Sequence, residues 1–270
     1  MVIGQLALAP LPVVACRPEG GSSAAVRLQA FAEEWGLDWV DAAGDEPARF
    51  TLALENGRIG LVPPLDRPDL GTHPLVIDFA ADPRFARPLA RKDALARATG
   101  WKAGYRPPVV DLTTGLGRDA WALASGGCEV TAVERHPVVW LLLTDALERA
   151  TAQPALAAVA ARIHPVFGDV LGEHPPALAG DRNTVWHLDP MFPERKKSAL
   201  VKRPMRIFHQ LVGEDPDAEA LFAWARRQPG ARWVVKRPPG APTIDASAPD
   251  IEYRSGRLRF DCYLAASPNS

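Results

Sequence analysis

The feature that most constrains the fold is a glycine-containing loop between a short apolar segment and a helical one. Val109-Val110-Asp111-Leu112 predicts a buried strand, and Gly115 and Gly117 lie in the loop that follows. Residues 117–125 predict a helix that ends at Gly126-Gly127. Glycine lets the backbone turn sharply and approach a ligand, and the helix N-terminus presents unpaired N–H groups. This unit therefore predicts a ligand-binding turn at the edge of an α/β sheet.

Strands and helices continue to alternate along the chain, which predicts a doubly wound parallel sheet of the Rossmann-like type. The predicted segments are strands at 129–133, 163–167, 185–188 and 232–235, helices at 138–150, 198–212 and 217–228, and a final hairpin of 252–253 and 258–264. We assign this domain to residues 107–270.

The first 80 residues have a different character, with short apolar segments separated by proline and glycine. Asn56-Gly57 lies between the apolar runs 50–54 and 59–62, which predicts a β-hairpin. Residues 75–79 predict a further strand. We expect a small β-rich or α+β lobe over 1–80, joined by a helical linker over 81–106 in which 85–100 form the helix.

Acidic residues around the loop decide which cofactor it fits. Gly115-x-Gly117-x-x-Ala120 matches a dinucleotide fingerprint, but Asp111 and Asp119 would repel a pyrophosphate. Carboxylates there suit the sulfonium and ammonium groups of S-adenosylmethionine. A nicotinamide cofactor, or a loop that only packs a helix on the sheet, remains the alternative.

Two further acids follow later strands. Glu134 lies 19 residues after Gly115, where a carboxylate can accept hydrogen bonds from both ribose hydroxyls. Asp169 follows the strand at 163–167 and has the chemistry to accept a hydrogen bond from the adenine amine, although an aspartate there is also typical of a helix N-cap.

Asp189-Pro190-Met191-Phe192-Pro193 follows the strand at 185–188 and predicts chemistry on an exocyclic amine. The lone pair of such a nitrogen is delocalised into the ring. Asp189 and the carbonyl of Pro190 are two acceptors that can localise it toward a methyl donor, and Phe192 can stack on the base. A proline-stiffened loop with Phe192 in the core is the other interpretation.

A basic segment follows directly, and the C-terminal 80 residues carry a net charge of +5 although the whole chain carries −1. Such a segment would neutralise nucleic-acid phosphates beside the pocket, unless it is only a solvated surface. The candidate RNA-binding residues are Arg195, Lys196, Lys197, Lys202, Arg203 and Arg206, with Lys236 and Arg237 at the end of the last strand.

The cysteines and the hydropathy of the chain indicate its cellular compartment. Cys16, Cys128 and Cys262 are scattered, with no spacing typical of a metal site, so we expect no metal and a reducing compartment. No apolar run approaches the ~20 residues of a membrane-spanning helix. We expect a cytoplasmic protein with no membrane partner.

Together these motifs resemble the ribosomal RNA small-subunit methyltransferase J family. The resemblance covers roughly residues 100–265, and it is carried by Asp111 to Ala120, Glu134-Arg135-x-Pro137, Asp189 to Pro193, Lys197 to Lys202 and Val234 to Pro238. It implies a Rossmann-like enzyme that uses S-adenosylmethionine to form N2-methylguanosine in small-subunit ribosomal RNA, with the RNA or the small ribosomal subunit as partner.

The resemblance also implies which residues contact the cofactor or lie beside it. These are Arg118, Asp119, Glu134, Arg135, Gly168, Asp169 and Asp189. Three alternatives stay open at this point: methylation of another base, methylation of a protein amide, and a non-catalytic RNA-binding assembly factor.

Overall fold

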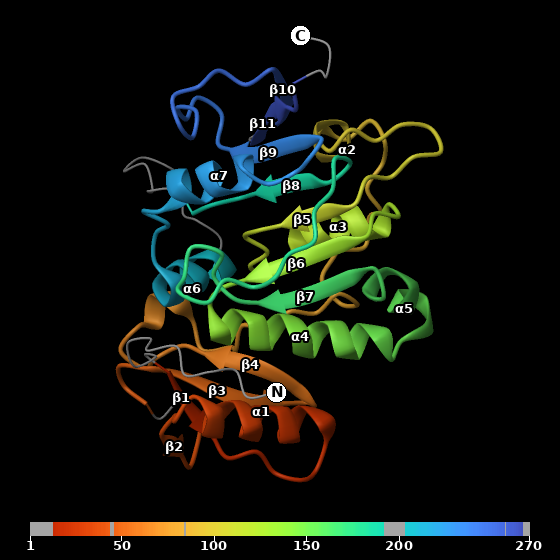
Figure 1. The fold of residues 1–270 in the computed structure, drawn as a ribbon. Helices are drawn as coiled ribbons and strands as arrows, with labels where there is room; N and C mark the ends of the chain where they lie inside the picture. Colours follow the sequence, from red (N-terminus) through yellow and green to blue (C-terminus); the bar gives the residue numbers. More distant parts are fainter. Residues whose placement is uncertain (1–12, 44–45, 84, 192–202, 257, 267–270) are drawn as a thin grey trace. The chain divides into compact units, whose positions relative to one another are not determined.

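A computed structural model of the chain describes residues 13–43, 46–83, 85–191, 203–256 and 258–266 (Figure 1). The described residues form two compact units. The first contains residues 13–77 and 203–213, and the second contains 78–191 and 214–266. The predicted domains at 1–80, 81–106 and 107–270 differ from this division in two ways. Residues 81–106 belong to the second unit, and the helix near 203–212 belongs to the first.

A four-stranded sheet forms the first unit, in the order β2-β1-β3-β4. Its strands are β1 (Val13–Cys16), β2 (Trp39–Val40), β3 (Phe50–Glu55) and β4 (Arg58–Val62). The predicted hairpin is confirmed, because β3 and β4 pair antiparallel around Asn56 and Gly57. Both turn residues have positive φ, 51° and 72°, as a tight two-residue hairpin turn requires.

Helices complete this unit. They are α1 (Ser23–Glu34), the short 3-10 helix η1 (Pro68–Leu70) and α6 (Arg203–Val212). Side chains of α6 reach back more than 130 residues along the chain. Arg203 donates to the carbonyls of Leu70 and His73, and Arg67 donates to Gln210 at 2.6 Å. These bonds explain why α6 groups with the N-terminal residues. Residues 198–202 of its predicted span lie outside the described residues.

The second unit contains a seven-stranded sheet in the order β10-β11-β9-β8-β5-β6-β7 (Figure 1). Its strands are β5 (Val109–Asp111), β6 (Val130–Glu134), β7 (Ile163–Phe167), β8 (Val185–Leu188), β9 (Arg232–Arg237), β10 (Ile251–Ser255) and β11 (Leu258–Leu264). The strands from β7 to β9 are mutually parallel, and the final hairpin of β10 and β11 is antiparallel. The doubly wound prediction is therefore confirmed.

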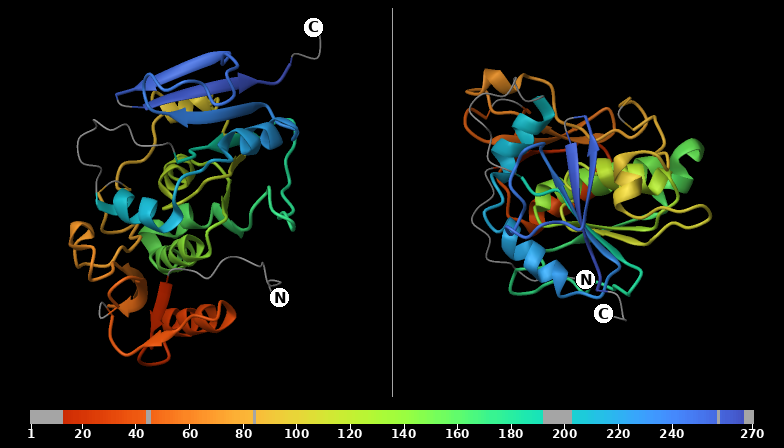
Figure 2. Two further views of the ribbon diagram at one scale, coloured as in Figure 1. Left: turned by 90° about the vertical axis from the view of Figure 1, so that its left-hand side faces the viewer. Right: turned by 90° about the horizontal axis from the view of Figure 1, so that it is seen from above.

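Helices cover both faces of this sheet. They are α2 (Ala94–Ala98), α3 (Arg118–Ser125), α4 (Pro137–Thr151), α5 (Pro154–Ala160) and α7 (Ala218–Arg226). α7 lies on one face and α2 lies on the other (Figure 2). β5 lies between β6, which follows it in the chain, and β8, so the order of the strands along the sheet reverses direction at β5. Ligands of doubly wound sheets bind at such a switch point, outside the carboxyl ends of the strands.

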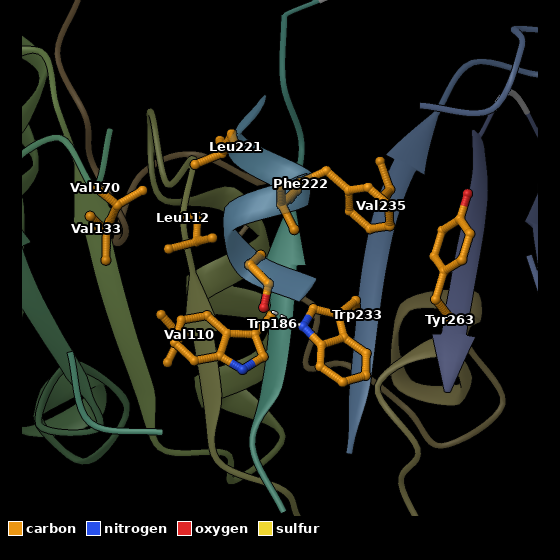
Figure 3. Close-up of a cluster of buried hydrophobic side chains, with 12 residues drawn as sticks. Val110, Leu112, Val133, Val170, Trp186, Leu221, Phe222, Trp233, Val235 and Tyr263 are labelled. Atoms are coloured by element: carbon orange, nitrogen blue, oxygen red, sulfur yellow. Dashed lines mark hydrogen bonds between the residues drawn. The ribbon is translucent and has the colours of Figure 1, made fainter. Parts of the chain in front are cut away.

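A hydrophobic cluster of the second unit lies between α7 and the central strands (Figure 3). Phe222 of α7 and Trp186 of β8 are each 1% exposed. Their aromatic rings pack in one cluster with Val110 and Val235 of the strands on either side of β8. Trp233 Nε1 donates to the Ala225 carbonyl at 2.7 Å, so a buried hydrogen bond also fixes α7 to β9. This packing holds the strand ends of the site in a rigid frame.

Two local predictions are wrong. Residues 85–100 contain only the five-residue α2, and 75–79 make an isolated bridge from Leu75 to Leu61 instead of a strand. Phe79 and Phe85 instead pack on Trp121 of α3, and the Phe79 and Trp121 rings stack with centroids 4.1 Å apart. Aromatic burial in an irregular segment leaves no periodic pattern to predict.

Candidate functional site

Acidic and basic side chains gather at the carboxyl ends of the five parallel strands. Asp111 ends β5 and Glu134 ends β6, while Asp169 follows β7 and Asp189 follows β8. Lys236 is the penultimate residue of β9. Because the five strands are parallel, these ends meet at one edge of the sheet. The strand-end acids predicted from the sequence are therefore on the same edge.

The glycine loop has the backbone conformation that its residues predict. Gly115 and Gly117 have φ values of 54° and 74°, in the left-handed region that favours glycine. Gly117 is the N-cap of α3, and a Cβ there would lie 2.8 Å from Leu143 Cδ1 and 3.3 Å from Phe79 Cζ. The loop therefore requires glycine at 117 for both conformation and space.

Glu134 fixes this loop from the neighbouring strand. Its two carboxylate oxygens accept the backbone N–H of Gly115 at 2.8 Å and that of His136 at 2.7 Å. Burial raises the pKa of Glu134 to about 7, against the opposing effect of the two backbone donors. Hydrogen bonding to ribose hydroxyls at this carboxylate stays a prediction.

A buried histidine lies between two aspartates beside the loop. His187 of β8 has its Nδ1 3.2 Å from Asp111 Oδ1 and its Nε2 3.3 Å from Asp119 Oδ2. The His187 side chain is fully buried and that of Asp111 is 1% exposed. Although burial disfavours a charged ring, the two carboxylates raise the pKa of His187 to about 10. The two carboxylates therefore favour the imidazolium form of His187.

Lys236 continues this polar chain toward the DPMFP segment. Its Nζ donates to Asp119 Oδ2 at 3.1 Å and to Asp189 Oδ2 at 2.7 Å. Burial opposes the ammonium, but the two carboxylates hold the pKa of Lys236 above its ordinary range. Lys236 and His187 in turn hold the pKa of Asp119 well below its ordinary value, although burial alone would raise it.

The Asp189 side chain is 40% exposed, more than any of the other four charged side chains in this row. Its backbone N–H donates to Thr113 Oγ1 at 2.6 Å, which ties the start of the DPMFP segment to the glycine loop. Pro190 is buried directly beside it. Phe192, the predicted stacking residue, lies outside the described residues.

Arg135 forms a hub of ion pairs after β6. Its guanidinium contacts Asp215 at 2.5 Å, Asp217 at 2.6 Å and Asp169 at 3.8 Å. Asp215 also accepts the backbone N–H of Met191 at 2.6 Å. Arg135 therefore supports the segment around Asp189 through Asp215. Direct contact of Arg135 with a cofactor stays a prediction.

Asp169 and Gly168 make a turn after β7. Asp169 Oδ1 accepts the backbone N–H of Leu171 at 2.8 Å, and no helix begins here within the described part of the chain, so the N-cap alternative is wrong. Gly168 has a φ of 148°, and a Cβ there would lie 3.0 Å from Pro176. The Asp169 side chain is 35% exposed, which leaves it accessible to a ligand.

Arg118 gives an independent sign of a ligand at the loop. It is the first residue of α3, and its Nε and Nη2 are buried without a hydrogen-bond partner among the described residues. Unpaired buried N–H groups are costly, and a guanidinium is suited to a carboxylate. S-adenosylmethionine carries a carboxylate on its methionine part, so the donor set present here fits that cofactor.

The predicted RNA-binding residues have separate locations. Lys236 is 15% exposed and paired with two carboxylates, and Arg237 is 5% exposed with its guanidinium donating to the Pro242 carbonyl. Neither presents an exposed cation, so the expectation of phosphate contacts at these two residues is corrected. Arg203 and Arg206 lie on α6 of the first unit. Arg195, Lys196, Lys197 and Lys202 lie outside the described residues.

Sequence reasoning missed four residues that organise the site. His187 interrupts an otherwise apolar buried strand, and that exception was the available signal. Thr113 lies inside the glycine loop, where a hydroxyl has many structural uses. Asp215 and Asp217 gave no signal, because their partner Arg135 is about 80 residues away in the sequence.

Two absences concern the described part of the chain alone. Among those residues, no helix has both the length and the apolar composition needed to cross a membrane. Within the same ranges, no group of three or more histidine, cysteine and acidic side chains is arranged to hold a metal ion.

Comparison with known proteins agrees with this geometry. Residues 31–265 match the model of a SAM-dependent methyltransferase family. The crystal structure of a SAM-dependent methyltransferase from Neisseria gonorrhoeae is 28% identical to this chain, with a TM-score of 0.68. The match covers 93% of this chain and 95% of that one. The fold and the site therefore define an S-adenosylmethionine-dependent methyltransferase, and the expected cofactor is confirmed.

Curated relatives identify the family more narrowly. A protein named ribosomal RNA small subunit methyltransferase J from Edwardsiella ictaluri is 43% identical, over 91% of this chain and 95% of its own length. A protein of the same name from Alteromonas mediterranea is 38% identical, over 89% of this chain and 92% of its own. The chain belongs to the ribosomal RNA small subunit methyltransferase J family, as its motifs suggested.

Proposed function

We propose that this chain transfers a methyl group from S-adenosylmethionine to the exocyclic N2 of a guanosine in small-subunit ribosomal RNA. The observation that carries the proposal is the position of Asp189-Pro190 beside the glycine loop, held there by the hydrogen bond to Thr113. The names of the curated relatives support ribosomal RNA as the substrate. We infer that the small subunit or its RNA is the partner, and that the reaction occurs in the cytoplasm.

The residues at the carboxyl ends of the strands and in the glycine loop have distinct proposed roles in holding the cofactor. Glu134 accepts hydrogen bonds from ribose hydroxyls, and Asp169 accepts one from the adenine amine. The unpaired guanidinium of Arg118 holds the methionine carboxylate. Asp111 and Asp119 supply negative potential to a ligand whose reacting end carries positive charge. Gly115, Gly117 and Gly168 let the backbone approach it.

Asp189 and Pro190 act on the base. When bound, the cofactor would supply a methyl group on a sulfonium: the N2 lone pair would form the new C–N bond, and the electron pair of the broken C–S bond would stay on sulfur. The Asp189 carboxylate accepts one amine proton and the Pro190 carbonyl accepts the hydrogen bond of the other, which localises the nitrogen lone pair. The proton ends on Asp189, and the products are N2-methylguanosine and S-adenosylhomocysteine. Phe192 is proposed to stack on the base.

RNA phosphates are proposed to contact the basic segment that follows the DPMFP segment in the sequence. Its members are Arg195, Lys196, Lys197, Lys202, Arg203 and Arg206. Among them, Arg206 lies 3.9 Å from Asp69 at its nearest ion-pair contact, and Arg203 is already bonded to backbone carbonyls. We therefore place more of the phosphate binding on residues 195–202.

The test uses small ribosomal subunits from cells that lack this methyltransferase, together with methyl-labelled S-adenosylmethionine. After transfer, the RNA is digested and the labelled nucleoside is identified. We expect N2-methylguanosine with the wild-type chain and at least a hundredfold slower transfer with Asp189→Asn. Glu219→Gln, an exposed carboxylate on α7, is the matched control and should retain activity. Label in another nucleoside, or label in protein alone, would contradict the proposal.

A further inference from the structure

The proposed function leaves two cations of the site without a role. Lys236 and His187 alternate with Asp111, Asp119 and Asp189 in one buried polar chain. This chain begins at the foot of the glycine loop and ends at the residue proposed to receive the amine proton. Its last link is the contact between Lys236 and Asp189.

Burial and ion pairing disfavour direct contact between Lys236 and RNA phosphates. Its side chain is 15% exposed, Asp119 on its inner side is 18% exposed, and Asp189 on its outer side is 40% exposed. Two carboxylate oxygens lie within 3.1 Å of its Nζ. An ammonium already engaged by two carboxylates gains little from a phosphate and loses much by leaving them. Lys236 is therefore engaged by the two carboxylates, one of which is the proposed proton acceptor Asp189.

We propose that Lys236 is a positioning residue for methyl transfer, which fixes the Asp189 carboxylate in its ionised form and in one orientation toward the target amine. This inference rests on the proposed role of Asp189. Lys236 is itself fixed by Asp119, and Asp119 by its contact with the His187 ring. These buried ion pairs hold the Lys236 ammonium in a fixed position against Asp189.

Orientation follows from two attachments. The backbone N–H of Asp189 is bound by Thr113, and its Oδ2 is bound by Lys236 at 2.7 Å. The first bond fixes the backbone from which the side chain extends, and the second restricts the orientation of the carboxylate. The arrangement assigns Oδ1 to the amine proton, because Oδ2 already accepts from the ammonium. A carboxylate fixed in this way needs no reorganisation when the base arrives.

Charge gives the second part of the inference. The titratable groups that face Asp189 are Lys236 from β9, Asp119 from α3 and His187 from β8. Partial burial raises the pKa of Asp189, Lys236 opposes that rise, and Asp119 adds to it. Without the ammonium, two carboxylates would share one site, and such pairs retain a proton. A protonated Asp189 cannot accept the proton of the amine.

The test measures single-turnover methyl transfer to small subunits from pH 5.5 to 9, at saturating cofactor and RNA. For Lys236→Met we expect a rate about tenfold or more below wild type at pH 6.5. The acidic limb of its pH profile should lie at least about one pH unit higher, so the rate recovers as pH rises. Lys236→Arg keeps a cation and should retain most of the activity. Exposed Lys102→Met is the matched control and should behave as wild type.

RNA binding separates this role from a phosphate contact. We expect Lys236→Met to bind the small subunit with unchanged affinity and an unchanged dependence on salt. A phosphate contact would instead reduce the slope of log affinity against log salt by about 1. A reduced slope, or an acidic limb at the wild-type pH, would overturn the inference.

Folding and the parent proposal are checked in the same series. Melting temperature and binding of S-adenosylhomocysteine report whether each variant is folded. If Lys236→Met does not fold, Lys236→Gln, which keeps a hydrogen-bond donor without the charge, carries the same test. If Asp189→Asn abolishes transfer while the uncharged Lys236 variants retain the wild-type profile, this inference alone fails. If the wild-type chain transfers no methyl to the RNA, the proposed function fails instead.

Discussion

Replacing His187 by glutamine tests whether a buried imidazolium between Asp111 and Asp119 stabilises the folded protein. Glutamine retains a hydrogen-bond donor of similar size but removes the charge between Asp111 and Asp119. Removing one partner of a buried ion pair costs about 3–5 kcal/mol. The rise in the pKa of His187, from 6.5 to about 10, sets a similar upper limit of roughly 4–5 kcal/mol. We expect a loss of about 3 kcal/mol in the free energy of unfolding at pH 6.

The pH dependence of that loss has a definite sign. A group whose pKa is raised by folding stabilises the folded state fully below its unfolded pKa, near 6.5, and less as pH rises toward about 10. The difference between wild type and His187→Gln should therefore shrink between pH 6.5 and 10.

Urea unfolding at pH 6 and at pH 9.5, followed by the fluorescence of buried Trp186 and Trp233, measures this difference. NMR of the histidine rings, with His187→Gln as the assignment control, measures the charge directly. A His187 ring that is neutral at pH 7, or a stability difference that grows with pH, would refute the reasoning.

Four further substitutions test the glycine loop, the ion pairs of Arg135 and the hydrophobic core. Gly117→Ala forces a left-handed alanine against Leu143, so we expect about 1–2 kcal/mol of destabilisation by urea and weaker S-adenosylhomocysteine binding by calorimetry. Asp215→Ala removes both the Arg135 ion pair and the acceptor of the Met191 N–H, so methyl transfer should slow roughly tenfold with cofactor affinity retained. Asp217→Ala, which breaks only an Arg135 contact, should slow it less, and equal effects would contradict the role of the Met191 bond. Phe222→Ala should lower the free energy of unfolding by about 3–5 kcal/mol, and a loss below 1 kcal/mol would show that this core repacks.

Local patterns were sufficient to predict the sheet and its active edge. Short apolar strands followed by glycine or acidic residues gave the positions of Asp111, Glu134 and Asp189, because parallel strands bring their carboxyl ends together. The sharp turn expected at the two glycines is present, with positive φ at Gly115 and Gly117. These features depend on neighbours in the sequence, which a single chain displays.

Ion pairs between residues that are distant in the sequence could not be predicted from local sequence patterns. Lys236 resembled a surface cation in Lys236-Arg237-Pro238, yet it pairs with Asp119, which is 117 residues away. The bonds of Arg203 to the carbonyls of Leu70 and His73 likewise join α6 to N-terminal residues of the same unit across about 130 residues. Composition shows that a cation is present, but only the three-dimensional fold decides whether it meets solvent, phosphate or carboxylate.

The proposed function requires that this chain forms N2-methylguanosine in small-subunit ribosomal RNA through Asp189. Its most direct test is nucleoside mass spectrometry of that RNA from cells in which the gene is deleted and then restored. We predict that one N2-methylguanosine is lost on deletion, returns with the wild-type gene and does not return with Asp189→Asn expressed at the same level. An unchanged N2-methylguanosine content after deletion, or full recovery with Asp189→Asn, would contradict the account.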